Sequence, residues 1–442
     1  MSESTHRQKT QLVRGIGQFG SAFIVLNGMI GSGIFVLPSV IAARLGILSP
    51  WLFLVAGVLI ITVILSLAEL SSYFKESGGP VLYATRAFGP LAGFSTGWLY
   101  YVSRAAAIAA NSHALAIYCG ALWPWFDTNA GHGVVIVVIC TGLTLINVLG
   151  VKGGVRALAV FTFFKVIPLL VLVLLGLQYV TPEVLFPDSM PTFDDLGGTT
   201  LLLIFAYVGF ESVLITAGET QQPTVTVPRA LVRTVIATGV LYFLISLVYV
   251  SVLPDDLASG GTLVDVGRKL AGPVGAIAIT LTAIFSISGN LSSTMLAVPR
   301  LTLSLAELRL LPGWFGRLHE KYATPANSII FLGGLSALLA LSGSFVRLAI
   351  ASSLTRLVTY GVCIAALPII RKKADSTMLA QAYRIKGGNT IPVIGFSLCV
   401  WMASFSSADS WKYLIGLLAL GLALYWLEQL RSSKSGNRSS TN

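Results

Sequence analysis

The sequence has few charged residues for its length. Only 11% of its 442 residues are Asp, Glu, Lys or Arg, whereas 55% are hydrophobic. About a quarter of the residues in a typical soluble domain are charged, so this composition argues against a soluble globular protein. The net charge of +11 is spread over loops and tails and forms no compact basic patch, so we expect no nucleic-acid partner. Membrane lipid is the expected environment of most of the chain.

Residues that build metal or catalytic sites are also scarce. The four cysteines lie singly within apolar stretches, which argues against a disulfide framework or a cysteine-ligated zinc site. The four histidines have no metal-ligand spacing, and no HExxH motif is present. We therefore expect no metal, no cofactor and no enzymatic activity.

Apolar stretches long enough to cross a bilayer recur along almost the whole chain. A helix needs about 20 mostly apolar residues to span the hydrocarbon core. Short polar loops separate twelve such stretches, at approximately 16–45, 50–73, 87–123, 133–149, 155–178, 198–218, 231–253, 273–305, 327–342, 345–370, 390–405 and 412–430. The predicted fold class is an all-α membrane protein with twelve transmembrane helices.

The loop charges predict the orientation of the chain. Basic residues precede the first span and recur in every second loop, whereas the opposite loops are mainly acidic. Because Lys and Arg are retained on the cytoplasmic side, we expect a multi-pass protein of the plasma (inner) membrane with both termini in the cytoplasm. The first apolar run is longer than a signal-peptide core. Residues 1–15 are therefore expected to form a cytoplasmic tail, 16–430 the membrane domain and 431–442 a second cytoplasmic tail.

The stretch NGMIGSGIFVLP interrupts the first span. Its central residues are Gly31, Ser32 and Gly33. Backbone groups freed inside a membrane must be satisfied by protein or by a water-filled cavity. The half-helix that follows would direct unpaired amides and its positive dipole end at a carboxylate, and the half-helix ending near Met29 would offer carbonyls to an ammonium group. The alternative is close helix packing through Gly28 and Ser32.

A second interruption favours the binding-site interpretation. The stretch FAYVGFES, residues 205–212, lies in the sixth span, at the corresponding position if spans 1–5 and 6–10 are repeats. Matched Gly-interrupted helices are typical of inverted-repeat transporters with a binding site at the membrane midplane. We therefore place repeat one at about 16–178, repeat two at about 198–370, and spans 11 and 12 at about 390–430.

Five segments together carry a family resemblance over nearly the whole chain. They are GMIGSGIFVLP, AELSSYFKESGGPVLYATRAFGPLAGFSTGW, NVLGVKGGVRALAVFTFFK, FAYVGFESVLITAGETQQPTVTVPRAL and AELRLLPGWFGRLHEKYATP. The chain resembles the amino acid, polyamine and organocation (APC) superfamily of permeases, although Glu307 and Leu308 depart from the usual Arg-Asp-Gly of the last segment. The resemblance implies a LeuT-like bundle of two inverted five-helix repeats and amino acid transport by alternating access.

The resemblance also implies roles for individual residues. In such permeases the amides of the Gly-Ser-Gly unit, here 31–33, receive the carboxylate of the amino acid. Main-chain carbonyls of the two broken helices receive its ammonium group, which points to Met29, Phe205 and Val208. The aromatic residue at the Phe205 position also acts as a gate over the substrate in the family.

Charged residues within the spans are the remaining functional candidates, because each costs about 2.5–3.5 kcal/mol at mid-depth. Lys165 lies about three turns into the fifth span and resembles a lysine whose ammonium replaces sodium in some superfamily members. It is expected to bond first-span carbonyls and eighth-span hydroxyls. Its role is either coupling to substrate binding, which we favour, or that of a fixed structural cation. Glu69 and Glu219 lie near the cytoplasmic ends of their spans, where helix capping or pairing with loops is their expected structural role.

The acid Glu211 lies within the second interruption. An acid at this position titrates and couples protonation to release in some family members, and a permanent salt bridge or acceptance of span 6 amides is an equally open role. Arg104 and Asn111 lie on one polar face of the third span, and Arg356 is an interior cation of the tenth. Either arginine could neutralise Glu211 or disfavour cationic substrates.

The expected function is secondary amino acid transport, by symport or exchange. Neutral amino acids are the first choice, because nothing in the sequence points strongly to a cationic substrate. The partners are then the small-molecule amino acid, membrane lipid and, where transport is coupled, protons. A permease for polyamines or other organic cations and a passive channel or facilitator are the alternatives, because a broken helix can also line a pore.

Overall fold

The computed structural model is helical throughout the part of the chain that it describes. The described residues are 16–76, 78–149, 155–186, 192–257, 260–322, 324–375, 379 and 382–439. Among them the only β-type pairing is an isolated bridge between Ile16 and Thr220, which confirms the predicted all-α class. The cytoplasmic tail expected at 1–15 lies outside the described residues, as do positions 440–442 of the second tail.

The helices follow one another with short connections. The first half of the chain contains α1 (Gln18–Met29), α2 (Gly33–Leu45), α3 (Ser49–Ser72), α4 (Gly79–Phe88), α5 (Pro90–Gly120), α6 (Asn129–Leu149), α7 (Val155–Gly176) and α8 (Pro182–Leu185). The second half contains α9 (Phe193–Tyr207), α10 (Ser212–Ile215), α11 (Pro223–Val252), α12 (Leu263–Glu307), α13 (Ala326–Ser342), α14 (Phe345–Lys373), α16 (Thr390–Ser404) and α17 (Ala408–Ser439). Every predicted span overlaps one of these helices or an interrupted pair.

Several helix bounds differ from the predicted ones for local reasons. Helix α11 begins earlier, at Pro223, because proline is tolerated in the first turn of a helix. Helix α12 also begins earlier, where the side chain of Thr262 caps the amide of Val264. It bends at Gly272, whose φ is 62°, close to the predicted start. Helix α17 continues to Ser439, into the expected tail.

Many of the helices are suited to a membrane. Seven helical stretches are long and apolar enough to cross one: Gly33–Ser72, Asn129–Leu149, Thr162–Tyr179, Pro223–Val252, Leu263–Glu307, Phe345–Lys373 and Ala408–Arg431. Three shorter apolar helices lie at Leu196–Tyr207, Ala326–Ser342 and Thr390–Ser404. Helix α5 is 31 residues long, and most of its side chains are buried inside the bundle. The described part of the chain is therefore that of a multi-pass membrane protein.

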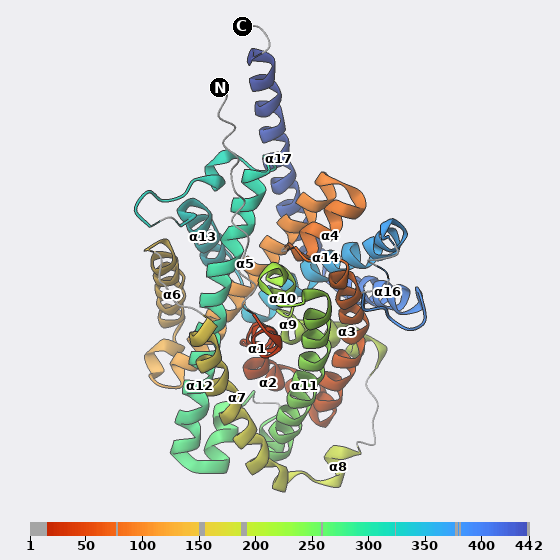
Figure 1. The fold of residues 1–442 in the computed structure, drawn as a ribbon. Helices are drawn as coiled ribbons and strands as arrows, with labels where there is room; N and C mark the ends of the chain where they lie inside the picture. Colours follow the sequence, from red (N-terminus) through yellow and green to blue (C-terminus); the bar gives the residue numbers. More distant parts are fainter. Residues whose placement is uncertain are drawn as a thin grey trace.

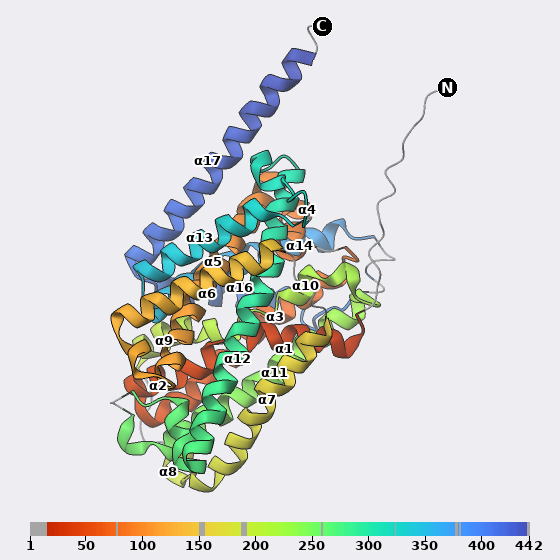
Figure 2. The same ribbon diagram turned by 90° about the vertical axis from the view of Figure 1, so that its left-hand side faces the viewer.

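The interrupted helices occupy the middle of the bundle. Figure 1 shows α1, α2, α9 and α10 at the centre, with α3, α5, α11, α12 and α14 around them. Helix α11 packs along α3, α14 along α5, and α12 against both α5 and α7. In Figure 2, α4 and the C-terminal end of α17 lie toward one end of the bundle, and α8 and the connection from α11 to α12 lie at the other.

At the α4 end, Glu69 is fully buried and holds several elements together. Its carboxylate forms a two-point ion pair with Arg371, with both N–O distances 2.7 Å. It also accepts hydrogen bonds from the hydroxyl of Tyr73 (3.0 Å) and from the backbone amide of Ile385 (2.9 Å). The expected pairing of Glu69 with a loop is therefore confirmed, and it joins α3 and α14 to the segment before α16.

Candidate functional site

The first interruption consists of the three residues between α1 and α2. Ile30 has a ψ of 86°, outside the helical range. The amides freed here turn to other acceptors. Gly31 N–H donates to the carbonyl of Met29 at 2.9 Å, and Ser32 N–H donates to Oδ1 of Asn111 at 3.2 Å. The helix therefore breaks where the sequence predicts, and a side chain of α5 reaches the break.

The second interruption consists of the four residues between α9 and α10. Gly209 has a φ of 108°, which residues with a side chain rarely adopt. Its N–H donates to Oε2 of Glu211 at 2.7 Å. The buried carboxylate thus satisfies an amide that the broken helix leaves free, which is one of the roles expected for Glu211.

The two interruptions lie directly against each other. A Cβ added to Gly28 would overlap with the carbonyl of Gly209, and one added to Gly209 would overlap with the carbonyl of Gly28. A Cβ on Gly33 would lie 2.8 Å from Cα of Ala206. Only glycine permits such close backbone approach. Gly28 therefore serves close packing, as one interpretation expected, and the helix is interrupted next to it. The start of α2 lies against the ends of α1 and α9.

A chain of asparagine side chains connects the first interruption to α5 and α12. Oδ1 of Asn111 accepts hydrogen bonds from both the amide and the hydroxyl of Ser32. Nδ2 of Asn111 donates to Oδ1 of Asn290 at 3.2 Å, and Nδ2 of Asn290 donates to the carbonyls of Asn27 (3.2 Å) and Gly28 (3.0 Å). Sequence reasoning identified Asn111 and missed Asn290. A lone amide side chain inside the apolar stretch of α12 was the signal that could have found it.

Lys165 reaches the first interruption from α7. Its fully buried ammonium group donates to Oδ1 of Asn27 at 2.5 Å and to the carbonyl of Ile30 at 3.0 Å. The hydroxyl of Ser286, on α12, donates to the same carbonyl at 3.1 Å. Lys165 therefore meets a first-span carbonyl, as expected. The expected bond from Lys165 to an α12 hydroxyl does not form among the described residues, because the hydroxyl of Ser286 donates to the same carbonyl instead. No carboxylate pairs with Lys165 among the ion pairs of the described residues.

Glu211 forms a fully buried ion pair with Arg356 of α14. Nη1 of Arg356 lies 2.5 Å from Oε1 of Glu211, and neither side chain is exposed. The hydroxyl of Tyr360 donates to the same oxygen. Arg356 also donates from Nε to the hydroxyl of Ser103 at 2.7 Å, and its guanidinium lies 5.6 Å from the ring centre of Tyr100. Of the two candidate arginines, Arg356 neutralises Glu211.

Arg104 has a different environment. Its Nη2 donates to the hydroxyl of Thr294, on α12, at 2.5 Å. Its Nε is buried without a hydrogen-bond partner among the described residues. The two residues of the expected polar face of α5 thus have different partners. Asn111 contacts the first interruption, and Arg104, which lies nearer the start of α5, contacts Thr294 of α12.

The other predicted binding residues are buried at the same junction, and their roles toward a substrate stay predictions. The carbonyl of Met29 accepts a hydrogen bond from the hydroxyl of Tyr242 at 3.0 Å. The ring of Phe205 packs edge-to-face on that of Phe345, with centroids 5.6 Å apart. Val208 is 6% exposed.

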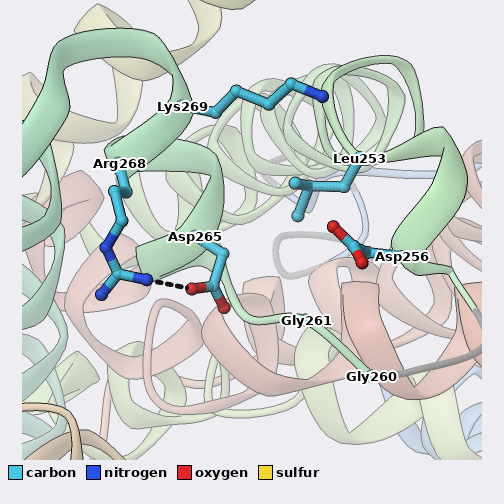
Figure 3. Close-up of a pocket in the computed structure, with 7 residues that line it drawn as sticks. All are labelled: Leu253, Asp256, Gly260, Gly261, Asp265, Arg268 and Lys269. Atoms are coloured by element: carbon cyan, nitrogen blue, oxygen red, sulfur yellow. Dashed lines mark hydrogen bonds and ion pairs between the residues drawn. The ribbon is translucent and has the colours of Figure 1, made fainter.

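A polar pocket of about 480 Å³ lies away from this junction, where α11 connects to α12. Figure 3 shows its charged residues. Arg268 is paired with Asp265 at 2.7 Å, and the side chain of Lys269 points away from this pair. Arg268 is 59% exposed and Asp265 36%. These side chains lie at the end of the bundle opposite α4 and take no part in the contacts of the two interruptions.

Comparison with known proteins covers nearly the whole chain. A family model described as amino acid permease matches residues 16–418. The chain is 26% identical to the methylthioribose transporter of Bacillus subtilis, over 97% of this chain and 96% of that protein. It is also 26% identical to two further proteins of that organism. These are the serine/threonine exchanger SteT, with 95% of this chain and 98% of SteT covered, and the branched-chain amino acid permease BcaP, with 96% and 94% covered.

Proposed function

The chain belongs to the amino acid permease family, and we propose that it is a secondary transporter that moves amino acids across the plasma (inner) membrane by alternating access. Its resemblance to the APC superfamily is thereby confirmed. The three relatives are named as a transporter, an exchanger and a permease, not as enzymes. An amino acid is the substrate class to which the family points.

The proposed architecture is a LeuT-like bundle of twelve spans. Repeat one would comprise α1/α2, α3, α5, α6 and α7, and repeat two α9/α10, α11, α12, α13 and α14, followed by α16 and α17. Support comes from the order of the helices, because an interrupted helix opens each half. We further propose that the α4 end faces the cytoplasm, together with both termini, since the basic loops fall on that side of the sequence pattern.

The convergence of the two interruptions is the observation that carries the proposal. We propose that the amides of Gly31, Ser32 and Gly33 hold the substrate carboxylate and that carbonyls of Met29, Phe205 and Val208 hold its ammonium group. The positive end of α2 and the negative ends of α1 and α9 meet there. Asn111 Oδ1 accepts the two hydrogen bonds from Ser32 that a carboxylate oxygen could accept.

Neutral amino acids are the proposed substrates. SteT is named for serine and threonine, and BcaP for branched-chain amino acids. Excess positive charge in the described interior disfavours polyamines and other organic cations. The methylthioribose transporter shows that related chains also act on other compounds. Lys165 and Glu211 are the proposed coupling residues, for proton symport or for exchange.

Ligand-induced stabilisation tests this function directly. The purified full-length protein would be heated with each member of an amino acid panel, with spermidine and putrescine included. A ligand that binds only the folded state stabilises it, by about 2.7 kcal/mol at a ligand concentration a hundred times Kd. This stabilisation is measured as a rise in melting temperature. The proposal predicts stabilisation by one or more L-amino acids and none by their D-enantiomers. Stabilisation by polyamines alone would favour the organic-cation alternative.

A further inference from the structure

Arg104 is a buried cation that no carboxylate contacts among the described residues. Its side chain is only 6% exposed. Nη2 has Thr294 as a hydrogen-bond acceptor, whereas Nε has no partner among the residues that the structure describes. Removing a guanidinium from water is costly unless its donors and its charge find partners. The Nε–H of Arg104 is therefore a buried donor that an anionic ligand would satisfy.

Positive charge exceeds negative charge in the described interior. The charged side chains that are buried there are Glu69, Arg104, Lys165, Glu211 and Arg356. Glu69 is paired with Arg371 at the α4 end, and Glu211 is paired with Arg356. Arg104 interacts electrostatically with this second pair, but Arg356 already holds its carboxylate. Arg104 and Lys165 are thus the two buried cations that form no ion pair within the described part of the chain.

The position of Arg104 relates it to the junction of the interruptions. Its backbone is two turns from Asn111 along α5, about 10 Å. Its guanidinium contacts Thr294, which lies about one turn, or about 6 Å, from Asn290 on α12. Asn111 and Asn290 are the side chains that hold the first interruption. The hydroxyl of Thr294 donates in turn to the carbonyl of Asn290 at 2.8 Å, so a short chain of hydrogen bonds connects Arg104 to the residue that holds the first interruption.

We propose that Arg104 forms a carboxylate-binding subsite beside the amides of the first interruption. This inference rests on the proposed transport function. It adds that Arg104 influences either which substrate binds or how fast the substrate passes. Guanidinium groups bind carboxylates through two parallel hydrogen bonds, which lysine cannot reproduce. A carboxylate at this place supplies the acceptor that Nε lacks and the negative charge that the interior lacks.

Two carboxylates have the required chemistry. One is the side-chain carboxylate of a dicarboxylic amino acid whose α-carboxylate is held by the first interruption. Arg104 then makes the site prefer glutamate or aspartate over their amides. The other is the α-carboxylate of a neutral amino acid in transit toward the α4 end, where α5 begins. Arg104 then speeds passage without setting that preference.

The test uses the full-length protein in proteoliposomes. Exchange of a labelled amino acid that the wild type transports is measured alone and in competition with glutamate, aspartate, glutamine and asparagine. Arg104→Gln removes the charge but keeps a donor for Thr294, and Arg104→Lys keeps the charge but removes the planar fork. Arg268→Gln is the matched control, since this arginine is 59% exposed near the start of α12. Thermal unfolding reports whether each variant is folded.

Either source of the carboxylate gives a distinct result. A side-chain carboxylate predicts that glutamate competes at least about tenfold better than glutamine in the wild type, and that Arg104→Gln removes this difference while neutral exchange remains. An α-carboxylate in transit predicts equal competition, with a maximal exchange rate that falls about tenfold in Arg104→Gln at unchanged half-saturation. In both cases Arg104→Lys retains part of the effect, and Arg268→Gln matches the wild type.

A folded Arg104→Gln variant with wild-type competition and wild-type exchange rate would overturn the subsite and leave amino acid transport intact. If that variant does not fold, the Arg104→Lys variant is used instead. Wild-type competition and a wild-type exchange rate in Arg104→Lys would then overturn the proposal. Absence of amino acid exchange in the wild type would instead overturn the proposed function, and this inference with it.

Discussion

Gly28 and Gly209 are in backbone contact, and each occupies the space that a Cβ of the other would need. They come from the interrupted helices of the two halves of the chain, 181 positions apart. Their contact fixes the separation of the half-helix ends without any side chain between them. A site built from amides and carbonyls depends on that separation, because hydrogen bonds weaken steeply when their geometry changes.

Gly209→Ala is expected to damage this junction. The φ of 108° is unfavourable for alanine, and the new Cβ would overlap with the carbonyl of Gly28. We expect a loss of about 1–3 kcal/mol in the free energy of unfolding, measured by thermal denaturation, together with loss of amino acid binding. Gly142→Ala in α6 is the control, because a Cβ there meets no atom within 4 Å. Equal effects of the two substitutions would contradict the account.

Asn111→Asp is expected to block the carboxylate site. A permanent negative charge would then accept the hydrogen bonds of Ser32 and repel the substrate carboxylate. Hydrogen bonds to charged groups contribute about 1.5–3 kcal/mol, so affinity should fall about ten- to a hundredfold in a titration of the purified protein. Asn147→Asp on α6 serves as the control for the same chemical change, because the side chain of Asn147 donates to its own helix, at the carbonyl of Leu143. Unchanged affinity in Asn111→Asp would show that Ser32 does not bind the substrate carboxylate.

Lys165→Gln is expected to alter the pH dependence of transport. The ammonium group joins Asn27 and Ile30 at the first interruption, so a change in its protonation would act on the broken helix. We expect exchange by the wild type to vary across a pH series and exchange by Lys165→Gln to be slower and flat. The exposed Lys269→Gln should follow the wild type. Parallel pH profiles for Lys165→Gln and the wild type would reduce Lys165 to a structural cation.

Glu69→Gln is expected to loosen the α4 end of the bundle. Arg371, Tyr73 and the amide of Ile385 all donate to this buried carboxylate. Breaking one partner of a buried ion pair costs about 3 kcal/mol, which thermal denaturation would detect. The pair of Glu76 with Arg86 is the comparison, since both side chains are more than half exposed, and Glu76→Gln should cost less than about 1 kcal/mol. A cost of less than about 1 kcal/mol for Glu69→Gln as well would contradict a stabilising role of the Glu69 cluster.

The breaks in the helices could be predicted from the sequence because glycine adopts the non-helical dihedral angles that an interrupted membrane span requires. The structure interrupts the first span at residues 30–32, with Gly33 as the first residue of α2, and interrupts the sixth span at Gly209, as expected. The resemblance to superfamily members with a lysine at this place, together with the need of freed carbonyls for partners, predicted that Lys165 would meet a carbonyl of the first span. It does so at Ile30.

The choice of partners could not be predicted, because it depends on how helices rotate and slide against each other. The helical periodicity placed Arg104 on the polar face of its helix but did not show how far along the bundle it lies relative to α14. Arg104 and Arg356 were therefore equal candidates for the ion pair with Glu211. The structure pairs Glu211 with Arg356. Asn290 was missed for the same reason, since its bonds to Asn27 and Gly28 depend on the contact between α12 and α1.

Counterflow in proteoliposomes tests the central claim most directly. Vesicles that contain the purified full-length protein and a high internal concentration of one unlabelled L-amino acid are exposed to a trace of the same amino acid in labelled form. The account predicts transient accumulation of label that saturates with concentration, excludes the D-enantiomer and is lost in Ser32→Pro, which removes one amide of the first interruption. The absence of accumulation for every amino acid tested, or uptake that never saturates, would contradict a carrier with a central amino acid site.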